Sequence, residues 1–362
     1  MNKIILNQTV SLPSIFKIDS NIYLDVFNIL KNNNIEFKKP LIVSGSSVSF
    51  NYAKHISELN KTPIHVLNKN TFSDVESLKD ICLENNYDFI ISVGGGKIQD
   101  SVKRVSYLIN INHISIPTII SNDGLISPIS VLINDNTLKT ESLPGVMPIG
   151  VIIDLKIINK APMKYFRAAV GDILSNLSAT NDWIISQKVS HEKINDIAFI
   201  MSKSSAISLI YFENKNFNFK PFQKQVIQGQ INSGIAMSLA GNSRPCSGSE
   251  HLISHAIDYL KCGKNILHGE QVAAISLFSL FLQDELIFSY LDYAKQTIKE
   301  INFIKNLINP TDSLYLDIYN YSKQMRPGRV TVLDTIDENE FISSINNFIN
   351  YLEFHESKTI IK

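Results

Sequence analysis

The segment Phe89-Ile-Ile-Ser-Val-Gly-Gly-Gly-Lys-Ile-Gln-Asp100 begins with an apolar run, which leads into three consecutive glycines at residues 94–96. A short apolar run bounded by glycine is typical of a strand buried on both faces. The residues that follow, from Gln99 to Leu108, have the apolar spacing of a helix. The segment therefore predicts a buried strand, a glycine turn and a helix in direct succession.

The same alternation continues on both sides of this segment. Strand-like runs occupy residues 40–44, 63–67, 113–116 and 151–154, and helix-like stretches occupy residues 49–59 and 74–85. Such alternation implies right-handed βαβ units and a mostly parallel sheet with helices on both faces. We therefore predict an α/β, Rossmann-like N-terminal domain over residues 1–160.

After residue 160 the pattern becomes helical. Helix-like stretches occupy residues 163–188, 194–212, 223–239, 250–260 and 271–282. We predict an all-α C-terminal domain over residues 161–362, with no internal repeat.

Composition narrows the class of protein. The chain has 362 residues, of which 44% are hydrophobic, and its 34 basic residues balance 34 acidic ones. Such a chain can fill a core, and it lacks the basic excess of a nucleic-acid binder. The longest near-continuous apolar run, Val272 to Leu282, is too short to span a bilayer, and MNKIILNQTV is not a signal peptide. Three cysteines without a CxxC motif suit a reducing compartment, so we expect a cytoplasmic protein.

Two loops at the predicted carboxyl edge of the sheet could hold a ligand. Consecutive glycines at Gly94 to Gly96 let a pyrophosphate approach the backbone at a helix N-terminus. A glycine turn that only joins the strand to the helix would have the same sequence. The second loop is Pro117 to Pro128, PTIISNDGLISP, which offers hydroxyl groups and the carboxylate of Asp123. An Asx-turn at its Asn-Asp-Gly sequence is an equally good explanation of that part.

Histidines cluster later in the chain. Three of the eight histidines, His251, His255 and His268, fall within 18 residues. His251 and His255 are four residues apart and so share one face of a helix. A carboxylate would complete a three-ligand metal site, and Asp172, after Gly171, is the best candidate by context. The pair His251/His255 remains open as an alternative pair of ligands. By contrast, Asp182-Trp183 is expected to be core packing with a carboxylate at the surface.

In order, these motifs resemble a known family. The chain carries GGGKxxD, PTxxSxDGxxSP, GDxLSNLxAxxDW, RPxSGSEHxxSHxxD and HGEQV, and then RPGRVTVL at residues 326–333. This series is similar to the sn-glycerol-1-phosphate dehydrogenases, part of the larger group of iron-containing alcohol dehydrogenases, glycerol dehydrogenases and dehydroquinate synthases. The resemblance implies the dehydroquinate synthase-like fold, in which an α/β dinucleotide-binding domain precedes a helical metal- and substrate-binding domain.

The resemblance also assigns residues. It implies metal ligation by Asp172, His251 and His268, which sets His255 beside the metal and not on it. It implies that Asp123, Asp172 and His255 are catalytic and contact the substrate. It implies a cofactor site made by Gly95, Gly96, Lys97, Ile98, Gln99, Asp100, Thr118, Ile119, Ile120, Ser121 and Ser127.

The implied reaction interconverts dihydroxyacetone phosphate and sn-glycerol 1-phosphate with NAD(P)H and one divalent metal ion, Zn²⁺ in this family and Ni²⁺ or Fe²⁺ in relatives. The strand ending at Gly45 lacks the acidic residue that NAD-specific relatives place there, so we expect NADPH to be accepted as well as NADH. Arg244 and Lys264 are candidates for the substrate phosphate. Asn122 stands where family members commonly have His, which bears on substrate positioning. Relatives are homo-oligomers, and we expect the same here.

Three alternatives share this fold. A glycerol or other polyol dehydrogenase would use an unphosphorylated substrate, and its activity would not depend on a phosphate. A dehydroquinate-synthase-like cyclase is disfavoured because its DSSVGGK loop is absent from the sequence. A binding or scaffold protein of the same fold would hold no metal.

Overall fold

The computed structural model describes residues 12–359, which divide into two compact units. The first unit contains residues 12–120 and 124–161, and the second contains residues 121–123 and 162–359. The three-residue segment Ser121–Asp123 is thus grouped with the helical unit, although it begins only four residues after the fifth strand ends at Pro117.

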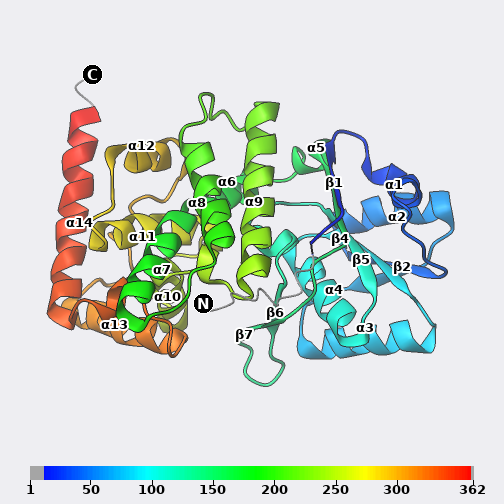
Figure 1. Ribbon diagram of the computed structural model, residues 1–362, viewed down its shortest axis with the longest axis horizontal. Helices are drawn as coiled ribbons and strands as arrows, with labels where there is room; N and C mark the ends of the chain where they lie inside the picture. The colour runs from blue at the N-terminus through cyan, green and yellow to red at the C-terminus, as the bar shows by residue number, and fades with distance from the viewer. Residues whose placement is uncertain (1–11, 360–362) are drawn as a thin grey trace, which may run out of the picture. The chain divides into compact units, whose positions relative to one another are not determined.

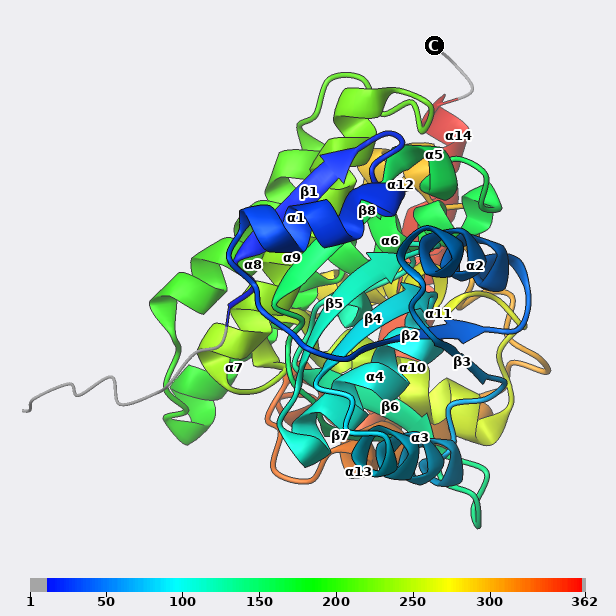
Figure 2. The ribbon, with the colours of Figure 1, turned by 90° about the vertical axis from the view of Figure 1, so that its right-hand side faces the viewer.

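A six-stranded parallel sheet forms the centre of the first unit, in the order β1-β8-β5-β4-β2-β3 (Figure 2). Its strands are β1 (Ile15–Asp19), β2 (Pro40–Gly45), β3 (Ile64–Leu67), β4 (Phe89–Gly94), β5 (Asn112–Pro117) and β8 (Gly150–Asp154). All six residues of β4 are buried, which explains its continuous apolar sequence. The predicted parallel α/β sheet is confirmed.

Helices cover both faces of this sheet. On one face, α1 (Val26–Asn32) and α2 (Val48–Asn60) pack against side chains such as Ile91 and Val93 of β4. On the other face, α3 (Phe72–Glu84) and α4 (Gly96–Ile109) pack against Ile90 of the same strand. Alternate residues of β4 therefore enter two separate cores, as a doubly wound sheet requires.

A two-stranded antiparallel hairpin, β6 (Ile129–Ile133) and β7 (Thr140–Pro144), completes the first unit after the β5 loop. The Lys103 ammonium of α4 donates hydrogen bonds to the Gly124 and Ile129 carbonyls, at 2.7 and 2.5 Å. It also lies 2.7 Å from the Asp100 carboxylate. Helix α4 is thereby fixed to the loop that precedes the hairpin.

The second unit is helical, with α6 to α9 at Met163–Leu174, Asn176–Ser190, Asp196–Ile210 and Lys220–Ala240. It continues with α10 to α14 at Ser249–Leu260, His268–Leu282, Phe288–Thr297, Asp312–Met325 and Glu338–Thr359 (Figure 1). Helix α6 packs against α11, α8 against α9, and α10 against α13. Within the described residues, no helix combines the length and apolar character needed to cross a bilayer.

The single helix predicted for residues 163–188 is wrong in one respect, because the structure divides it into α6 and α7 at Ser175. The Ser175 hydroxyl donates to the Asp172 carbonyl at 2.7 Å. Such a bond from a serine to the preceding turn competes with the regular helical ladder. Asp172 consequently lies in the last turn of α6.

Candidate metal centre and cofactor loop

Three histidines and one aspartate come together in the helical unit. His251 and His255 lie one turn apart on α10, and His268 is the first residue of α11. The His251 and His268 rings are 5.1 Å apart between centroids. Ligand atoms of Asp172, His251 and His268 all lie within 4.8 Å of one another, which is the spacing that a single metal ion needs. His255 is not part of this group, although its ring stacks on His268 at 6.0 Å.

Two glycines explain why Asp172 and His268 meet. A Cβ atom on Gly171 of α6 would overlap the Gly269 carbonyl oxygen, and one on Gly269 would overlap the Ala168 carbonyl oxygen. Only glycine at both positions lets the two helix backbones approach so closely. Asp172 and His268 are the direct neighbours of these glycines and are brought together by that contact.

The Asp172 carboxylate is buried, and it accepts hydrogen bonds from neighbouring groups of the protein. Its Oδ2 atom accepts hydrogen bonds from the Asp123 backbone N–H at 3.1 Å and from the Gln230 amide at 3.3 Å. Burial, with the nearby negative charge of Asp123, raises the pKa of Asp172 well above its ordinary value. A cation beside the group would reverse that effect, so the donor set fits a metal ion.

His251 is oriented by a buried carboxylate that sequence reasoning did not single out. Its Nδ1 atom lies 2.8 Å from Glu250 Oε1, and Glu250 also accepts from the Gly248 N–H and the Ser178 hydroxyl. With Nδ1–H donating to Glu250, the Nε2 atom carries the free lone pair that a metal ligand requires. Burial raises the pKa of Glu250 to about 7. In the sequence, only the position of Glu250 directly before His251 could have indicated this role.

The histidine rings are held in the form that binds metals. Burial, together with the positive charge of Arg326, lowers the pKa of His251, His255 and His268 to about 3. All three imidazoles are therefore neutral at physiological pH, and neutral imidazole is the ligating form.

Asp182 corrects one prediction, because its carboxylate is fully buried and not at the surface. It accepts hydrogen bonds from the backbone N–H groups of Ser249 and Val332, at 2.5 and 2.8 Å, and from the Gln283 amide. Burial raises the pKa of Asp182 to about 6. The carboxylate thus fixes the first residue of α10, the helix that carries His251. Its neighbour Trp183 is buried as predicted.

In the first unit, the glycine turn lies against the loop that follows β5. The Thr118 N–H donates to the Gly94 carbonyl at 3.1 Å, and a Cβ on Gly95 would be 2.9 Å from the Ile119 side chain. A Cβ on Gly96 would meet nothing within 4 Å. The opening of α4 therefore has free space beside its backbone, as a site for a pyrophosphate needs.

Several expected cofactor residues turn their side chains into the protein. Gln99 accepts from the Ser92 hydroxyl at 2.6 Å and donates to the Gly94 carbonyl, which holds the turn in shape. Ile98, Ile120 and Ser127 are buried, and Asp100 faces Lys103. Lys97 is exposed, and Ser121 is grouped with the helical unit. If Ile98, Ile120 and Ser127 contact a cofactor, they would have to do so through their backbone atoms.

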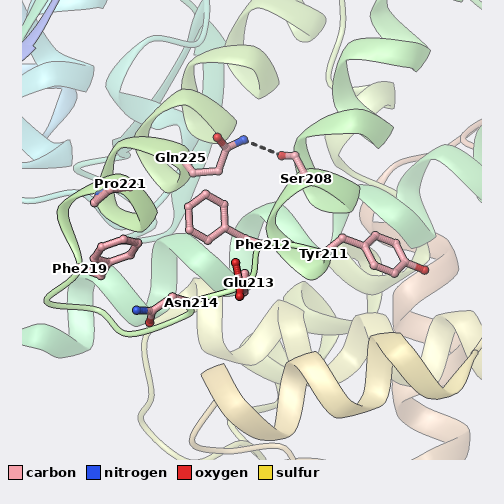
Figure 3. A pocket seen from close by; sticks show the side chains of 8 residues that line it. All are labelled: Ser208, Tyr211, Phe212, Glu213, Asn214, Phe219, Pro221 and Gln225. Carbon is pink, nitrogen blue, oxygen red and sulfur yellow. Dashed lines mark hydrogen bonds between the residues drawn. The ribbon is translucent and has the colours of Figure 1, made fainter.

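A surface cavity of about 750 Å³ lies elsewhere in the helical unit (Figure 3). It is lined at the α8–α9 connection by Ser208, Tyr211, Phe212, Glu213, Asn214, Phe219, Pro221 and Gln225. Gln225 and Ser208 are bonded to one another across it at 2.9 Å. None of Asp172, His251, His255 and His268 lines this cavity.

Comparison with known proteins agrees with this arrangement. Residues 18–162 match the sequence profile of the iron-containing alcohol dehydrogenase family. The chain is 37% identical over 256 residues to a glycerol-1-phosphate dehydrogenase (NAD(P)+) of Methanococcus aeolicus, covering 68% of this chain and 71% of that one. It is 34% identical over 268 residues to the protein of the same name from Pyrococcus furiosus, covering 72% and 76%.

Solved structures share the fold at lower identity. Glycerol dehydrogenase from Schizosaccharomyces pombe superposes with a TM-score of 0.73 at 19% identity, over 98% of this chain and 93% of that one. Sulfoacetaldehyde reductase from Bifidobacterium kashiwanohense gives 0.68 at 14% identity, over 95% and 98%. The likeness in fold and the closer likeness in sequence lead to one conclusion: the chain belongs to the glycerol-1-phosphate dehydrogenase family of iron-containing alcohol dehydrogenases.

Proposed function

We propose that this protein is a metal-dependent oxidoreductase that interconverts dihydroxyacetone phosphate and sn-glycerol 1-phosphate with NAD(P)H. The observation that carries the proposal is the convergence of Asp172, His251 and His268 in a chain with relatives of that name. Reduction of a ketone to a secondary alcohol needs a hydride, a proton and stabilisation of negative charge on oxygen. The residues of this chain can be assigned to each need.

Asp172, His251 and His268 would hold a divalent cation. One carboxylate and two neutral imidazoles suit Zn²⁺, which we propose as the metal, and the same donors also bind Ni²⁺ or Fe²⁺. When bound, such a cation supplies Lewis-acid polarisation of a carbonyl oxygen. Glu250 keeps His251 in the tautomer that presents Nε2.

His255 and Asp123 are proposed to act on the substrate. The His255 ring is neutral and stacks on His268, so one of its nitrogens can accept a proton while the other donates one. That property suits a relay between solvent and the new hydroxyl group. The Asp123 N–H is bonded to Asp172, which places the Asp123 residue beside the ligand set, where it can bind a substrate hydroxyl.

The glycine turn is proposed to hold the dinucleotide, which is the source of hydride. Gly95 to Asp100 would cradle the pyrophosphate, with Gly96 giving the space, and Thr118 to Ser121 with Ser127 would contact the nicotinamide side. Because β2 ends at Gly45 without an acidic residue, we propose that NADPH is accepted as well as NADH.

We further propose a cytoplasmic homo-oligomer. The three cysteines are free thiols, which suits a reducing compartment. Ile197 and Ile200 of α8 are 60% and 61% exposed and lie three residues apart on one helix face, which makes this face our candidate for contact with a second copy. Light scattering of the purified protein tests the oligomeric state.

The test of the reaction is oxidation of NADH and of NADPH with dihydroxyacetone phosphate or with dihydroxyacetone. Each assay is run on the isolated protein, after chelation, and after restoring Zn²⁺. Turnover with the phosphorylated ketone, lost on chelation and regained with Zn²⁺, is the expected result. Turnover with dihydroxyacetone alone would make the protein a polyol dehydrogenase, and inactivity with both in metal-loaded protein would refute the assignment.

A further inference from the structure

Two guanidinium groups converge on the short segment that precedes α10. Arg326 Nη1 donates to the Ser243 hydroxyl at 2.5 Å and reaches the Ser247 hydroxyl at 3.4 Å. Arg329 Nη1 donates to the Ser247 carbonyl at 2.5 Å, and its Nη2 donates to the Ser243 hydroxyl at 3.1 Å. Both arginines therefore share the same two serines.

Their charges lack a direct counter-ion. Among the described residues, no carboxylate oxygen lies within 4 Å of Arg326 or Arg329. Arg244, which adjoins Ser243, differs because its Nε and Nη2 atoms bind Glu192 at 2.5–3.1 Å. Arg244 therefore remains a predicted phosphate contact with part of its guanidinium already engaged by Glu192. Its Nη1 atom, however, is buried without a hydrogen-bond partner.

The result is an excess of positive charge, carried by the buried Arg244 and the partly buried Arg326 and Arg329. Burial and the neighbouring charges of Arg326 and Arg244 lower the pKa of Arg329 to about 9, and burial lowers the pKa of Arg326. Like charges gathered in a poorly solvated place are unfavourable unless an anion joins them. Glu192 pairs directly with Arg244 alone. Glu192 and the buried Glu250 offset part of the charge of Arg329, and Glu250 part of that of Arg326, without direct contact.

This excess lies next to the candidate metal centre. Ser247 precedes His251 by four residues, and the two are joined through the first turn of α10. Arg326 also acts electrostatically on His251, His255 and His268, lowering the pKa of each. A small substrate that reaches the ligand set can therefore place a charged end near these arginines.

We propose that Arg326 and Arg329 bind the phosphate group of the substrate, so that this pair selects a phosphorylated three-carbon ketone over its unphosphorylated form. The proposal rests on the proposed function and deepens it. Arg326 Nε and Nη2 and Arg329 Nε make no hydrogen bond to any described residue, which leaves donors for a dianion. Planar guanidinium forks match phosphate oxygens better than an ammonium does.

The experiment compares the Zn²⁺-loaded wild type with Arg326→Gln and Arg329→Gln. Loss of a charged hydrogen bond should raise KM for dihydroxyacetone phosphate by about 10- to 100-fold. The kcat/KM for dihydroxyacetone should change by less than about threefold, because that ketone has no phosphate to lose. Arg329→Lys keeps the charge without the fork and should fall between wild type and Arg329→Gln.

The matched control is Arg104→Gln, the same change of side chain and charge on α4 of the other unit. It should leave KM for both ketones unchanged. The ratio of kcat/KM for NADPH to that for NADH should also stay constant in the two arginine variants. A change in that ratio would show that the pair binds a cofactor phosphate and would overturn the proposal.

Binding of inorganic phosphate, followed by calorimetry, is the measurement that does not depend on turnover. Wild type should bind phosphate, and both glutamine variants should bind it about tenfold or more weakly. Equal losses of kcat/KM for both ketones, with phosphate binding unchanged, would mean that the arginines only support α10, and the proposal would fall. If wild type reduces neither ketone, but binds phosphate more tightly than the two glutamine variants, the proposed reaction is wrong and the anion site is still supported.

Discussion

The Nδ1 atom of His251 lies 2.8 Å from Oε1 of Glu250, a carboxylate with no solvent exposure. A histidine that donates one ring N–H to a buried carboxylate presents its other nitrogen as a fixed lone pair. Glu250 is itself held by the Gly248 N–H and the Ser178 hydroxyl. The orientation of His251, a proposed metal ligand, is therefore controlled by a residue that is not itself a proposed ligand.

Replacing this carboxylate should weaken metal binding without removing a ligand. We expect Glu250→Gln to lower Zn²⁺ affinity by about 10- to 100-fold. Competition against a chromophoric chelator measures the affinity without any substrate. Glu353→Gln, a surface carboxylate paired with Lys305, is the control and should bind Zn²⁺ like wild type. An unchanged affinity in Glu250→Gln would show that His251 needs no such support.

The two histidines of α10 should differ in their effects. His251→Ala removes a proposed ligand, so we expect it to lose bound Zn²⁺ and at least about 100-fold of activity. His255→Ala lies outside the ligand group and should keep a full equivalent of metal while losing activity. Elemental analysis of the dialysed variants separates the two cases. Metal loss in His255→Ala with retention in His251→Ala would overturn the ligand assignment.

The contact between α6 and α11 should not tolerate a methyl group. A Cβ on Gly269 would overlap backbone atoms of Ala168, which cannot move away as a flexible side chain would. We expect Gly269→Ala to destabilise the protein by about 3 kcal/mol and to reduce its metal content. Urea unfolding measures the change. A free energy of unfolding within error of wild type would contradict the close approach.

A methyl group at Gly96 should act on cofactor affinity instead. Because nothing lies within 4 Å of that position, Gly96→Ala should unfold at the same urea concentration as wild type. If the free space belongs to the pyrophosphate, the added methyl should raise KM for NADH and NADPH by about tenfold or more. Fluorescence titration of NADH gives the affinity directly. Normal NADH affinity in this variant would place the dinucleotide elsewhere.

The acid stability of the protein should depend on His113. This side chain is buried in β5, neither ring nitrogen has a hydrogen-bond partner among the described residues, and burial lowers its pKa to about 3. The unfolded chain takes up a proton near pH 6.5, whereas the folded chain does not. Stability is therefore lost as the pH falls from about 6.5 towards 3, by about 5 kcal/mol at most from this group.

We expect His113→Leu to remove that part of the acid sensitivity. The difference in unfolding midpoint between variant and wild type should grow in favour of the variant from pH 7 to pH 4.5. The same pH series on Arg104→Gln, a neutralised surface group of the same unit, gives the background. Parallel curves for wild type and His113→Leu would show that the buried ring does not limit acid stability.

Local sequence patterns predicted most of the architecture. The apolar runs of β2, β4 and β5 and the spacing of α2, α3 and α10 are properties of a few adjacent residues, so they can be recognised without the fold. Strand β1 (Ile15–Asp19) could not be recognised in this way. It is an edge strand with two charged residues, and it is defined by its pairing with β8, more than 130 residues away.

The candidate site was predictable only in part. The histidines stand close together in sequence, whereas their partner Asp172 comes from a helix about 80 residues earlier and was identified by context and resemblance. The burial of Asp182 and the role of Glu250 depend on side chains from distant helices that meet at α10. A single carboxylate in a sequence carries no sign of such partners.

Asp172 and His268, two of the proposed ligands, adjoin the two glycines at which α6 and α11 touch, so the spacing of their backbones is set by main-chain contact. Such a site is assembled before an ion arrives. Small zinc domains behave differently, because there the ion must fold the chain. This protein should instead survive the loss of its ion as a folded, reloadable apoprotein, whose activity can follow metal supply without new synthesis.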